Sequence, residues 1–521
     1  MLAKVYSYGI CGLDAYPVTI EVDVSRGLPS IAMVGLPDNA VKESKERVRS
    51  AIKNSGYLFD PQRITINLSP ADIRKEGPSF DLAMALGILA ATEQIDPSIL
   101  SQYIILGELS LDGHIRKVQG ALSIAMSISR DRCQGLILPA ENAKEAAVTQ
   151  NIPVFPVKTL NEVINFLHNP DAIVPIRLDN SSLLKEVNLH ALDFSEVKGQ
   201  THVKRGMEIA AAGGHNVLMI GPPGSGKTMI AKRVSTILPD LTLQECLETT
   251  RIHSVVGLVP SEKGLVVTRP FRSPHHTSSD VAMVGGGSFP KPGEVTLSHH
   301  GILFLDELPE FSRNVLESLR QPLEDRYVTV ARAAKTVCYP AQFMLIAAMN
   351  PCPCGFFWDK GSKRQCHCSP AQIQKYLAKI SGPLLDRIDI HLEVAALPSR
   401  ELLTSVQNES SAKIKARTDQ ARQRQHERLS GKNGFLSGKN SGIFTNAQMN
   451  QKQIKEFCGL TREGQDLLKA AIDELGLSAR AHDKILKVAR TIADLADKKE
   501  ISPEHIAEAI QYRSLDRNWW G

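Results

Sequence analysis

Residues 221–228 read Gly221-Pro222-Pro223-Gly224-Ser225-Gly226-Lys227-Thr228. An apolar run at 217–220 precedes them and a helix-compatible stretch follows, which is the strand–loop–helix context of a P-loop. The glycines allow backbone N–H groups to approach phosphate oxygens, and the helix N-terminus adds partial positive charge. We therefore expect Lys227 to reach the β- and γ-phosphates of ATP and Thr228 to ligate Mg²⁺.

Two further apolar runs end in polar residues suited to ATP hydrolysis. The run 302–305 is followed by Asp306 and Glu307, and the run 343–349 by Asn350. Fully apolar runs of this length are typical of strands buried on both faces of a parallel sheet. We expect Asp306 to hold Mg²⁺, Glu307 to polarise the attacking water and Asn350 to orient that water beside the γ-phosphate. The three runs together predict an ATP-hydrolysing α/β domain.

Composition indicates a multidomain globular protein. The 521 residues suggest three or four domains at roughly 150 residues each, and 42% hydrophobic with 22% charged residues is typical of a folded chain. A net charge of +5 is too small to identify a polyanionic partner. The longest apolar stretch, 82–91, is about half of the roughly 20 residues that a membrane span requires. Nine cysteines and the absence of a signal-peptide pattern favour the reducing cytoplasm.

The pattern of elements predicts an α/β multidomain chain. Residues 1–170 alternate short β-like runs with helical stretches, whereas the end of the chain has helical periodicity with caps at Ser478 and Ser502. The expected parts are a first α+β domain at 1–170, a linker at 171–195, the ATPase core at 196–398, a basic segment at 399–454 and a helical domain at 455–521.

The basic segment concentrates positive charge. Between 411 and 440, eight lysines and arginines stand against only Asp419 and Glu427. Such a run is either a solvated face or a contact for a polyanion, and both interpretations stay open. The cations are Lys413, Lys415, Arg417, Arg422, Arg424, Arg428, Lys432 and Lys439.

Four of the cysteines form two Cys-x-Cys pairs, Cys352 with Cys354 and Cys366 with Cys368. Four thiolates would make a closed tetrahedral site, and we therefore expect a structural Zn²⁺. Cys-x-Cys is tighter than the commoner C-x₂-C spacing, so a redox pair or a metal-free loop remains an alternative. His367 is a possible substitute for one ligand.

Several longer motifs resemble a known family. They are Arg272-Ser273-Pro274-His275-His276-Thr277, Val284-Gly285-Gly286-Gly287, Pro292-Gly293-Glu294, Phe304-Leu305-Asp306-Glu307-Leu308-Pro309-Glu310-Phe311 and Asn350-Pro351-Cys352-Pro353-Cys354-Gly355. Over essentially the whole chain, the sequence is similar to the YifB or ComM family of magnesium-chelatase-like AAA+ ATPases. The resemblance implies a Mg-chelatase-like AAA+ core with a C-terminal helical lid, binding ATP and Mg²⁺.

The resemblance also implies roles for individual residues. Asn350 would be sensor 1, Arg387 the arginine finger given to a neighbouring subunit and Arg480 sensor 2 on the lid. Arg332 and Lys335 would lie on a loop lining the ring's central pore, where they are candidate DNA contacts. A solvated hairpin tip is the alternative for this last pair.

The first domain resembles a Lon-type protease. Lys75-Glu76-Gly77-Pro78-Ser79 is similar to the segment around the nucleophilic serine of that family, and residues 107–139 to the part that follows. A serine needs a base to act as a nucleophile. Where Lon has its lysine, this chain reads 118–122 Val-Gln-Gly-Ala-Leu, and Phe80 replaces a small residue. We therefore expect a Lon-like fold without peptidase activity.

The resemblance implies a cytoplasmic ring, a hexamer, that couples ATP hydrolysis to movement along single-stranded and branched duplex DNA. Its expected task is branch migration as a helicase in recombination during natural transformation. One alternative is a magnesium-chelatase-type ATPase that inserts Mg²⁺ into a porphyrin, against which we find no D-x-S-x-S motif. The other is an ATP-dependent Lon-like protease, which the missing lysine disfavours.

Overall fold

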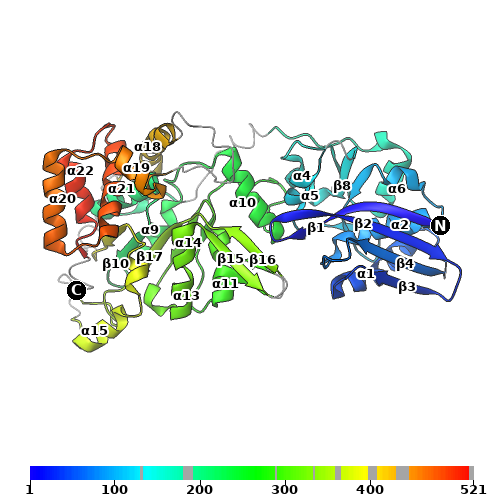
Figure 1. Ribbon diagram of the computed structural model, residues 1–521, viewed down its shortest axis with the longest axis horizontal. Coiled ribbons are helices and arrows are strands. Elements are labelled where there is room, and N and C mark those ends of the chain that lie inside the picture. The colour runs from blue at the N-terminus through cyan, green and yellow to red at the C-terminus, as the bar shows by residue number, and fades with distance from the viewer. Residues whose placement is uncertain are drawn as a thin grey trace. The chain divides into compact units, whose positions relative to one another are not determined.

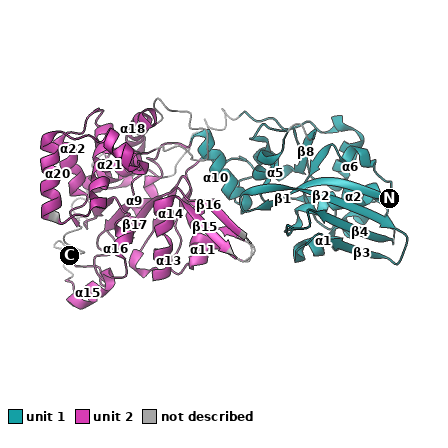
Figure 2. Cartoon of the chain, viewed as in Figure 1, with its two compact units in different colours: residues 1–187, 242–267 teal, residues 188–241, 268–521 magenta. Residues whose placement is uncertain are grey.

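The computed structural model describes residues 1–60, 62–129, 133–179, 192–287, 290–332, 335–357, 365–396, 408–429 and 445–515 (Figure 1). The chain forms two compact units, coloured separately in Figure 2. The first comprises residues 1–187 with 242–267, and the second comprises 188–241 with 268–521. Residues 242–267 therefore belong to the first unit, although they lie within the range 196–398 that the sequence assigns to the ATPase core.

Seven strands form the sheet of the first unit, in the order β3 (Ser30–Val34), β4 (Arg63–Ser69), β2 (Asp14–Ser25), β1 (Leu2–Cys11), β5 (Tyr103–Ile105), β8 (Gly135–Pro139) and β9 (Val154–Val157). The β1–β2 and β2–β4 pairs are antiparallel, and the other pairs are parallel. Buried and exposed residues alternate along β4, because successive side chains point to opposite faces. The buried face packs on α2 (Asp81–Ala91), every residue of which is buried.

Further elements of this unit are α1 (Asn39–Asn54), η1 (Pro78–Phe80), α3 (Pro97–Leu100), β6 (Glu108–Leu109), β7 (Ile115–Arg116), α4 (Ala121–Ser127), α5 (Ala140–Ala147), α6 (Leu160–His168), η3 (Pro170–Ala172) and α10 (Leu243–Val255). Polar contacts hold α10 in place. Arg251 Nη2 is 2.6 Å from Asp14 Oδ1, and the Ser254 hydroxyl donates to the buried carboxylate of Glu145. The buried contact of Ser254 helps to explain why residues 242–267 group with the first unit, since an unpaired Glu145 carboxylate would be costly there.

The second unit has a five-stranded sheet in the order β11 (Phe271–Arg272), β14 (Ile302–Leu305), β17 (Met344–Met349), β10 (Val217–Ile220) and β18 (Ile390–Glu393). All neighbouring pairs are parallel. Every residue of β10, β14 and β17 is buried, as the three apolar runs predict. The structure thus confirms an α/β fold whose ATPase-like core has a parallel sheet.

Around this sheet lie η4 (Phe194–Glu196), α8 (Thr201–Gly213), α9 (Lys227–Val234), α11 (Asp280–Val284), β12 (Gly285–Gly286), β13 (Lys291–Pro292), α12 (Glu294–Leu297), η5 (Leu308–Glu310), α13 (Arg313–Ser318), α14 (Arg320–Asp325), β15 (Tyr327–Arg332), β16 (Lys335–Pro340), α15 (Pro370–Leu377), α16 (Gly382–Leu385), α18 (Ser411–Leu429), η6 (Asn446–Gln448), α19 (Gln451–Phe457), α20 (Arg462–Leu475), α21 (Ala479–Leu495) and α22 (Pro503–Gln511). One core cluster joins the sheet to α21 through Ile485, Val488 and Ile492. Ser478 and Ser502 cap α21 and α22, as predicted. Among the described residues, none of the helices is long and apolar enough to cross a membrane.

Candidate functional site

The P-loop connects the end of β10 to the start of α9, and glycine is required at several of its positions. Gly224 and Gly226 have φ of 78° and 92°, in the left-handed region that side chains disfavour. At Gly221, a Cβ would lie 2.1 Å from the backbone oxygen of Val394. The loop is therefore built from residues that leave its backbone open, as phosphate binding requires.

Lys227 lies at the centre of this loop. Its side chain is nearly buried, and Nζ donates to the backbone oxygens of Gly221 (2.7 Å) and Pro222 (2.8 Å) and to Asn350 Oδ1 (3.1 Å). Burial lowers the pKa of Lys227 to about 8, although Asp306 and Glu307 act in the opposite direction. The ammonium thus has neutral oxygens as its hydrogen-bond partners, and an anionic phosphate would stabilise its charge more strongly.

The sheet brings the other predicted residues to the same edge. Asp306 follows β14 and Asn350 follows β17, which lies between β14 and β10, and the carboxyl ends of parallel strands meet at one edge. The Thr228 hydroxyl donates to Asp306 Oδ2 at 2.6 Å. Ser225 Oγ is buried and makes no hydrogen bond to any described residue. A hydroxyl beside a carboxylate is the oxygen donor set that suits Mg²⁺, and the unpartnered Ser225 hydroxyl leaves a polar atom for a ligand.

Glu307 begins the turn after β14 in an unusual conformation. Its φ is 53°, and its backbone N–H donates to Asp306 Oδ1 at 3.0 Å. Its carboxylate is 58% exposed, and His276 Nδ1 lies 3.6 Å from Oε2. His276 is thus positioned to orient Glu307. Sequence reasoning assigned His276 no such role, and its only signal was its place in the motif 272–277.

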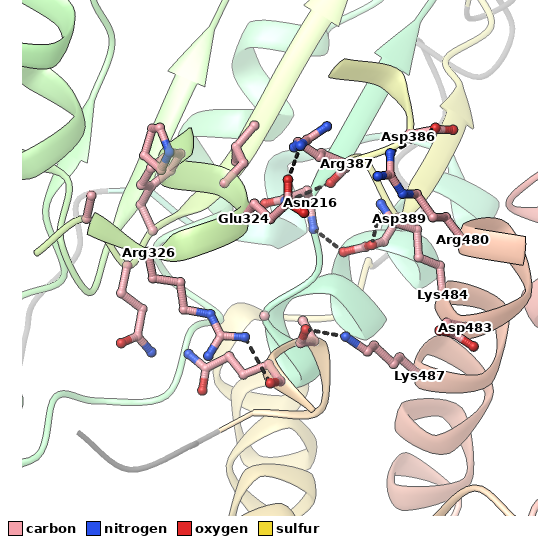
Figure 3. Close-up of a pocket in the computed structure, with 18 residues that line it drawn as sticks. Asn216, Glu324, Arg326, Asp386, Arg387, Asp389, Arg480, Asp483, Lys484 and Lys487 are labelled. Atoms are coloured by element: carbon pink, nitrogen blue, oxygen red, sulfur yellow. Dashed lines mark hydrogen bonds and ion pairs between the residues drawn. The ribbon is translucent and has the colours of Figure 1, made fainter. Parts of the chain in front are cut away.

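Arg387 and Arg480 form a second group of predicted residues. Both line a pocket of about 300 Å³ to which no P-loop residue contributes (Figure 3). Arg387 pairs with Glu324 and donates through Nη1 to the backbone oxygen of Pro383 at 2.6 Å. Arg480 is 61% exposed, with Nη1 3.6 Å from Asp386 Oδ2. Within one chain, the structure therefore groups the predicted arginine finger with the predicted sensor 2 and not with the P-loop.

A buried ion pair supports this pocket. Lys484 Nζ is 3.0 Å from Asp389 Oδ1, and both side chains are largely buried. Burial would raise the pKa of the Asp389 carboxyl, but Lys484 and His215 hold that pKa well below its usual value. Asp389 Oδ2 also accepts from the backbone N–H of Asn216 at 3.0 Å. The segment that carries Arg387 is thus fixed to the base of β10.

The four predicted zinc ligands meet in space. Their sulfur atoms all lie within 4.8 Å of one another. Cys352 Sγ is 3.3 Å from Cys354 Sγ and 3.7 Å from Cys366 Sγ, and the Cys354–Cys366 sulfur distance is 3.5 Å. Cys368 completes the cluster, and all four are free thiols. His367 lies outside this ligand set.

The arginines of the basic segment have partners inside the protein. On α18, Arg417 pairs with Glu208 and Glu409, and Arg428 pairs with Asp494 at 2.5 Å. The other two donate to backbone oxygens, Arg422 to Ala211 and Ala212 and Arg424 to Asp494. These contacts use the guanidinium groups to hold α18 in place. Lys432 and Lys439 lie outside the described residues.

Two other predictions concern more distant regions. Arg332 and Lys335 end the β15–β16 pairing, but their side chains are outside the part that the structure describes. In the first unit, Lys75 is fully buried, and its Nζ donates to the backbone oxygens of Pro70 and Ile73. Burial lowers the pKa of Lys75, with Asp72 opposing. Its ammonium is thus engaged by its own turn.

Comparison with known protein families gives matches along most of the chain. The family model described as magnesium chelatase, subunit ChlI, matches residues 193–402, the ChlI C-terminal model matches 408–513, and a model of subunit ChlI of Mg-chelatase matches 20–142. The chain is also similar to part of the Lon protease of Brevibacillus choshinensis, at 26% identity over 159 residues, which is 28% of this chain and 20% of that protein.

Two relatives match over nearly their full length. The uncharacterized protein YifB of Salmonella typhimurium is 44% identical over 519 residues, covering 99% of this chain and 98% of the relative. The competence protein ComM of Haemophilus influenzae is 42% identical over 520 residues, with the same coverage. Because both identities extend over nearly the whole of each chain, this protein belongs to the YifB and ComM family of magnesium-chelatase-like AAA+ proteins.

Proposed function

We propose that this protein is an ATP-hydrolysing AAA+ motor that acts on DNA as a ring. One observation carries the ATPase assignment: Lys227, the Thr228–Asp306 pair and Asn350 converge at the carboxyl edge of one parallel sheet. This is the arrangement that phosphoryl transfer to water requires. Membership in a magnesium-chelatase-like AAA+ family supports the same conclusion.

Each residue of this edge has a chemical task. The P-loop N–H groups and Lys227 bind the phosphates, while Thr228 and Asp306 would hold Mg²⁺, which neutralises developing charge when bound. Glu307 accepts the proton of the attacking water, and His276 keeps its carboxylate oriented. Asn350 orients the same water.

The position of Arg387 and Arg480 supports assembly. They share a pocket without P-loop residues, so they suit an ATP bound to a neighbouring subunit better than the ATP of their own chain. An arginine supplied in trans stabilises the charge of the transition state. We therefore propose that the chains form a closed ring, a hexamer, with active sites between subunits.

The DNA role rests on the relative named competence protein ComM. We propose branch migration of recombination intermediates, with single-stranded and branched duplex DNA as partners. The competing class is metal insertion, favoured by the magnesium chelatase description of the matching models. A Lon-like fold without peptidase activity is our proposal for the first unit, and the buried, engaged Lys75 supports it.

One assay separates these functions. ATP hydrolysis by the purified protein is measured alone and with single-stranded DNA, duplex DNA, a four-way junction, a porphyrin with Mg²⁺, and casein. Stimulation should be greatest with the junction. A larger effect of porphyrin would establish the chelatase class, and casein cleavage that Ser79→Ala abolishes would establish a protease.

We also propose that the four-cysteine cluster binds one structural Zn²⁺. Zn–S bonds of about 2.3 Å in a tetrahedron place sulfur atoms about 3.8 Å apart. The observed separations of 3.3 to 3.7 Å are close to that value. Elemental analysis should find about one zinc per chain. A folded native protein without zinc would contradict the proposal.

A further inference from the structure

The cysteine cluster continues directly from the strand that carries Asn350. β17 ends at Met349, Asn350 follows, and Cys352 is only two residues further on. Only Pro351 separates Cys352 from Asn350. A displacement of Cys352 would therefore move Asn350, whose side-chain oxygen accepts a hydrogen bond from Lys227. The cluster lies beside the ATP site because the chain offers no slack between them.

The same turn lies against the P-loop. Gly355 donates its N–H to the backbone oxygen of Cys352 at 3.0 Å, which closes a tight turn, and its φ is 86°. A Cβ at Gly355 would be 2.6 Å from Pro223 Cδ. The space beside Gly355 therefore has no room for a side chain. The cysteine turn and the pyrrolidine ring of Pro223 in the P-loop are in van der Waals contact.

The chain returns to Asn350 on the other side of the cluster. Ser369, next to Cys368, caps α15, and the nearly buried Tyr376 lies one residue before the end of that helix. Burial raises the pKa of Tyr376, while the backbone N–H of Asn350 acts in the opposite direction. The first Cys-x-Cys pair is thus joined to Asn350 through the chain, and the second leads directly into α15, the helix that carries Tyr376.

Several described residues around the cysteines are exposed to solvent. Pro353, Gln365, His367 and Ser369 are exposed, and each cysteine except Cys352 is only half-buried. Contacts between neutral thiols are weak, whereas Zn²⁺ binding to four thiolates contributes folding free energy directly. Metal binding would therefore add a strong interaction that fixes the turn against Pro223 and Asn350.

We propose that zinc in the four-cysteine cluster positions Asn350 and the P-loop, so that metal occupancy controls ATP hydrolysis. This inference rests on the zinc site proposed above. The cysteines act as positioning residues, since their effect on hydrolysis is exerted through Asn350 and Pro223. A misplacement of about 1 Å at a reacting group can reduce a rate about 100-fold, so a released turn should stop hydrolysis.

The test compares three forms of the full chain: native, Cys368→Ser and Cys368→His. The serine variant should lose zinc and reduce kcat by about 100-fold, while histidine, also a zinc ligand, should retain zinc and most of the activity. Cys11→Ser, in the first unit, is the matched control and should behave as native. Full kcat in a zinc-free, folded Cys368→Ser protein would overturn the inference. The separate proposal that the native protein binds zinc would still stand.

Hydrogen exchange supplies a readout that does not depend on turnover. Removal of zinc by a chelator should increase exchange in peptides covering 221–228 and 350–357, with no change in the first unit. Unchanged exchange in both peptides overturns the coupling. A native protein that binds zinc but never hydrolyses ATP would instead refute the proposed ATPase, and the exchange result would still decide the coupling.

If zinc removal unfolds the second unit, the cysteine variants cannot be interpreted, and Tyr376→Phe then provides the test. This variant keeps all four cysteines, so zinc content should remain native. Removal of the phenolic oxygen, on whose pKa the Asn350 backbone N–H acts, should lower kcat by about 2- to 10-fold with little change in nucleotide affinity. Tyr6→Phe in the first unit is its control. A native kcat in Tyr376→Phe would overturn the inference.

Discussion

Lys227 is a buried cation with only neutral hydrogen-bond partners, and this has consequences for its protonation. The lysine pKa falls from its ordinary value of 10.5 to about 8 on burial. In the unfolded chain the lysine stays protonated up to about pH 10. The folded protein therefore binds fewer protons between pH 8 and 10, so the penalty for burying this charge is greatest at neutral pH and is relieved as pH rises.

ATP binding should take up a proton above pH 8. Phosphate charge stabilises the ammonium and raises the pKa of Lys227, so a lysine that is neutral at pH 9 becomes charged in the complex. Calorimetric titration at pH 9 in two buffers of different ionisation enthalpy measures this uptake. The observed binding enthalpies should differ at pH 9 and agree at pH 7. If the binding enthalpies in the two buffers were equal at pH 9 as well as at pH 7, the pKa of Lys227 would not lie near 8. As a control, Lys227→Ala should show no binding at either pH.

Glu307→Gln should bind ATP and fail to hydrolyse it. Glutamine keeps the size of the side chain but cannot accept a proton, and loss of a general base reduces rates by about 100- to 10,000-fold. Phosphate release and a nucleotide titration measure the two properties separately. Glu427→Gln, an exposed change on α18, is the control. Normal turnover in the Glu307 variant would remove this carboxylate from the mechanism.

The helix α18 illustrates how an element can carry a strong charge pattern for structural reasons. Its arginines face Glu208 and Asp494, carboxylates with side-chain exposures of only 5% and 2%. A buried carboxylate requires charged partners, because desolvation without them is costly. The basic pattern therefore matches acids elsewhere in the second unit, and α18 serves to join α8 to the C-terminal helices.

Arg428→Gln should destabilise the protein, because it leaves Asp494 with fewer cationic partners. We expect a loss of about 1–3 kcal/mol in the free energy of unfolding, measured by urea denaturation. The exposed Lys413→Gln on the same helix should have almost no effect. DNA binding across a salt series should keep its slope in both variants. A slope reduced by about one unit in Arg428→Gln would show that this arginine neutralises a phosphate after all.

In the proposed ring, assembly would bring the P-loop edge of one subunit close to Arg387 and Arg480 of the next. The P-loop edge and the Arg387–Arg480 pocket are separate within a chain, and Arg387 is held there by Glu324. In the proposed ring, the phosphate of an ATP bound to a neighbouring subunit would therefore compete with this carboxylate for the guanidinium. The competition is favourable for ATP, since phosphate offers more charge in the same bidentate geometry.

Mixed rings provide the decisive measurement. Arg387→Ala and Lys227→Ala subunits should each be inactive, and a mixture should regain part of the native turnover. This is expected because, at some interfaces, an Arg387→Ala subunit supplies an intact Lys227 and its Lys227→Ala neighbour supplies an intact Arg387. Size-exclusion chromatography verifies that each variant assembles. Assembled mixtures without any turnover would show that Arg387 acts within its own chain or that every site must be intact.

The convergence of the P-loop, Asp306 and Asn350 at one edge of the sheet was predictable because local sequence encodes it. A P-loop needs glycines at positions with positive φ, and each buried strand of a parallel sheet needs an apolar run, so 221–228, Asp306 and Asn350 could be identified by position alone. The cysteine cluster was predictable for a similar reason, since thiols close in sequence can share one metal. These features depend on interactions within a few residues or on strand order, which the parallel-sheet rule supplies.

Other features depend on contacts between distant segments. The partners of Arg417 and Arg428 lie at Glu208 and Asp494, so the charge count on α18 could not reveal that its arginines are internally paired. Residues 242–267 join the first unit through Arg251 and Ser254, and the contact of Gly355 with Pro223 spans more than a hundred residues. Sequence patterns determine which side chains are available and the local backbone they prefer. The pairing of charges and loops is decided by the tertiary fold, because desolvation and close packing depend on neighbours that only the folded chain brings together.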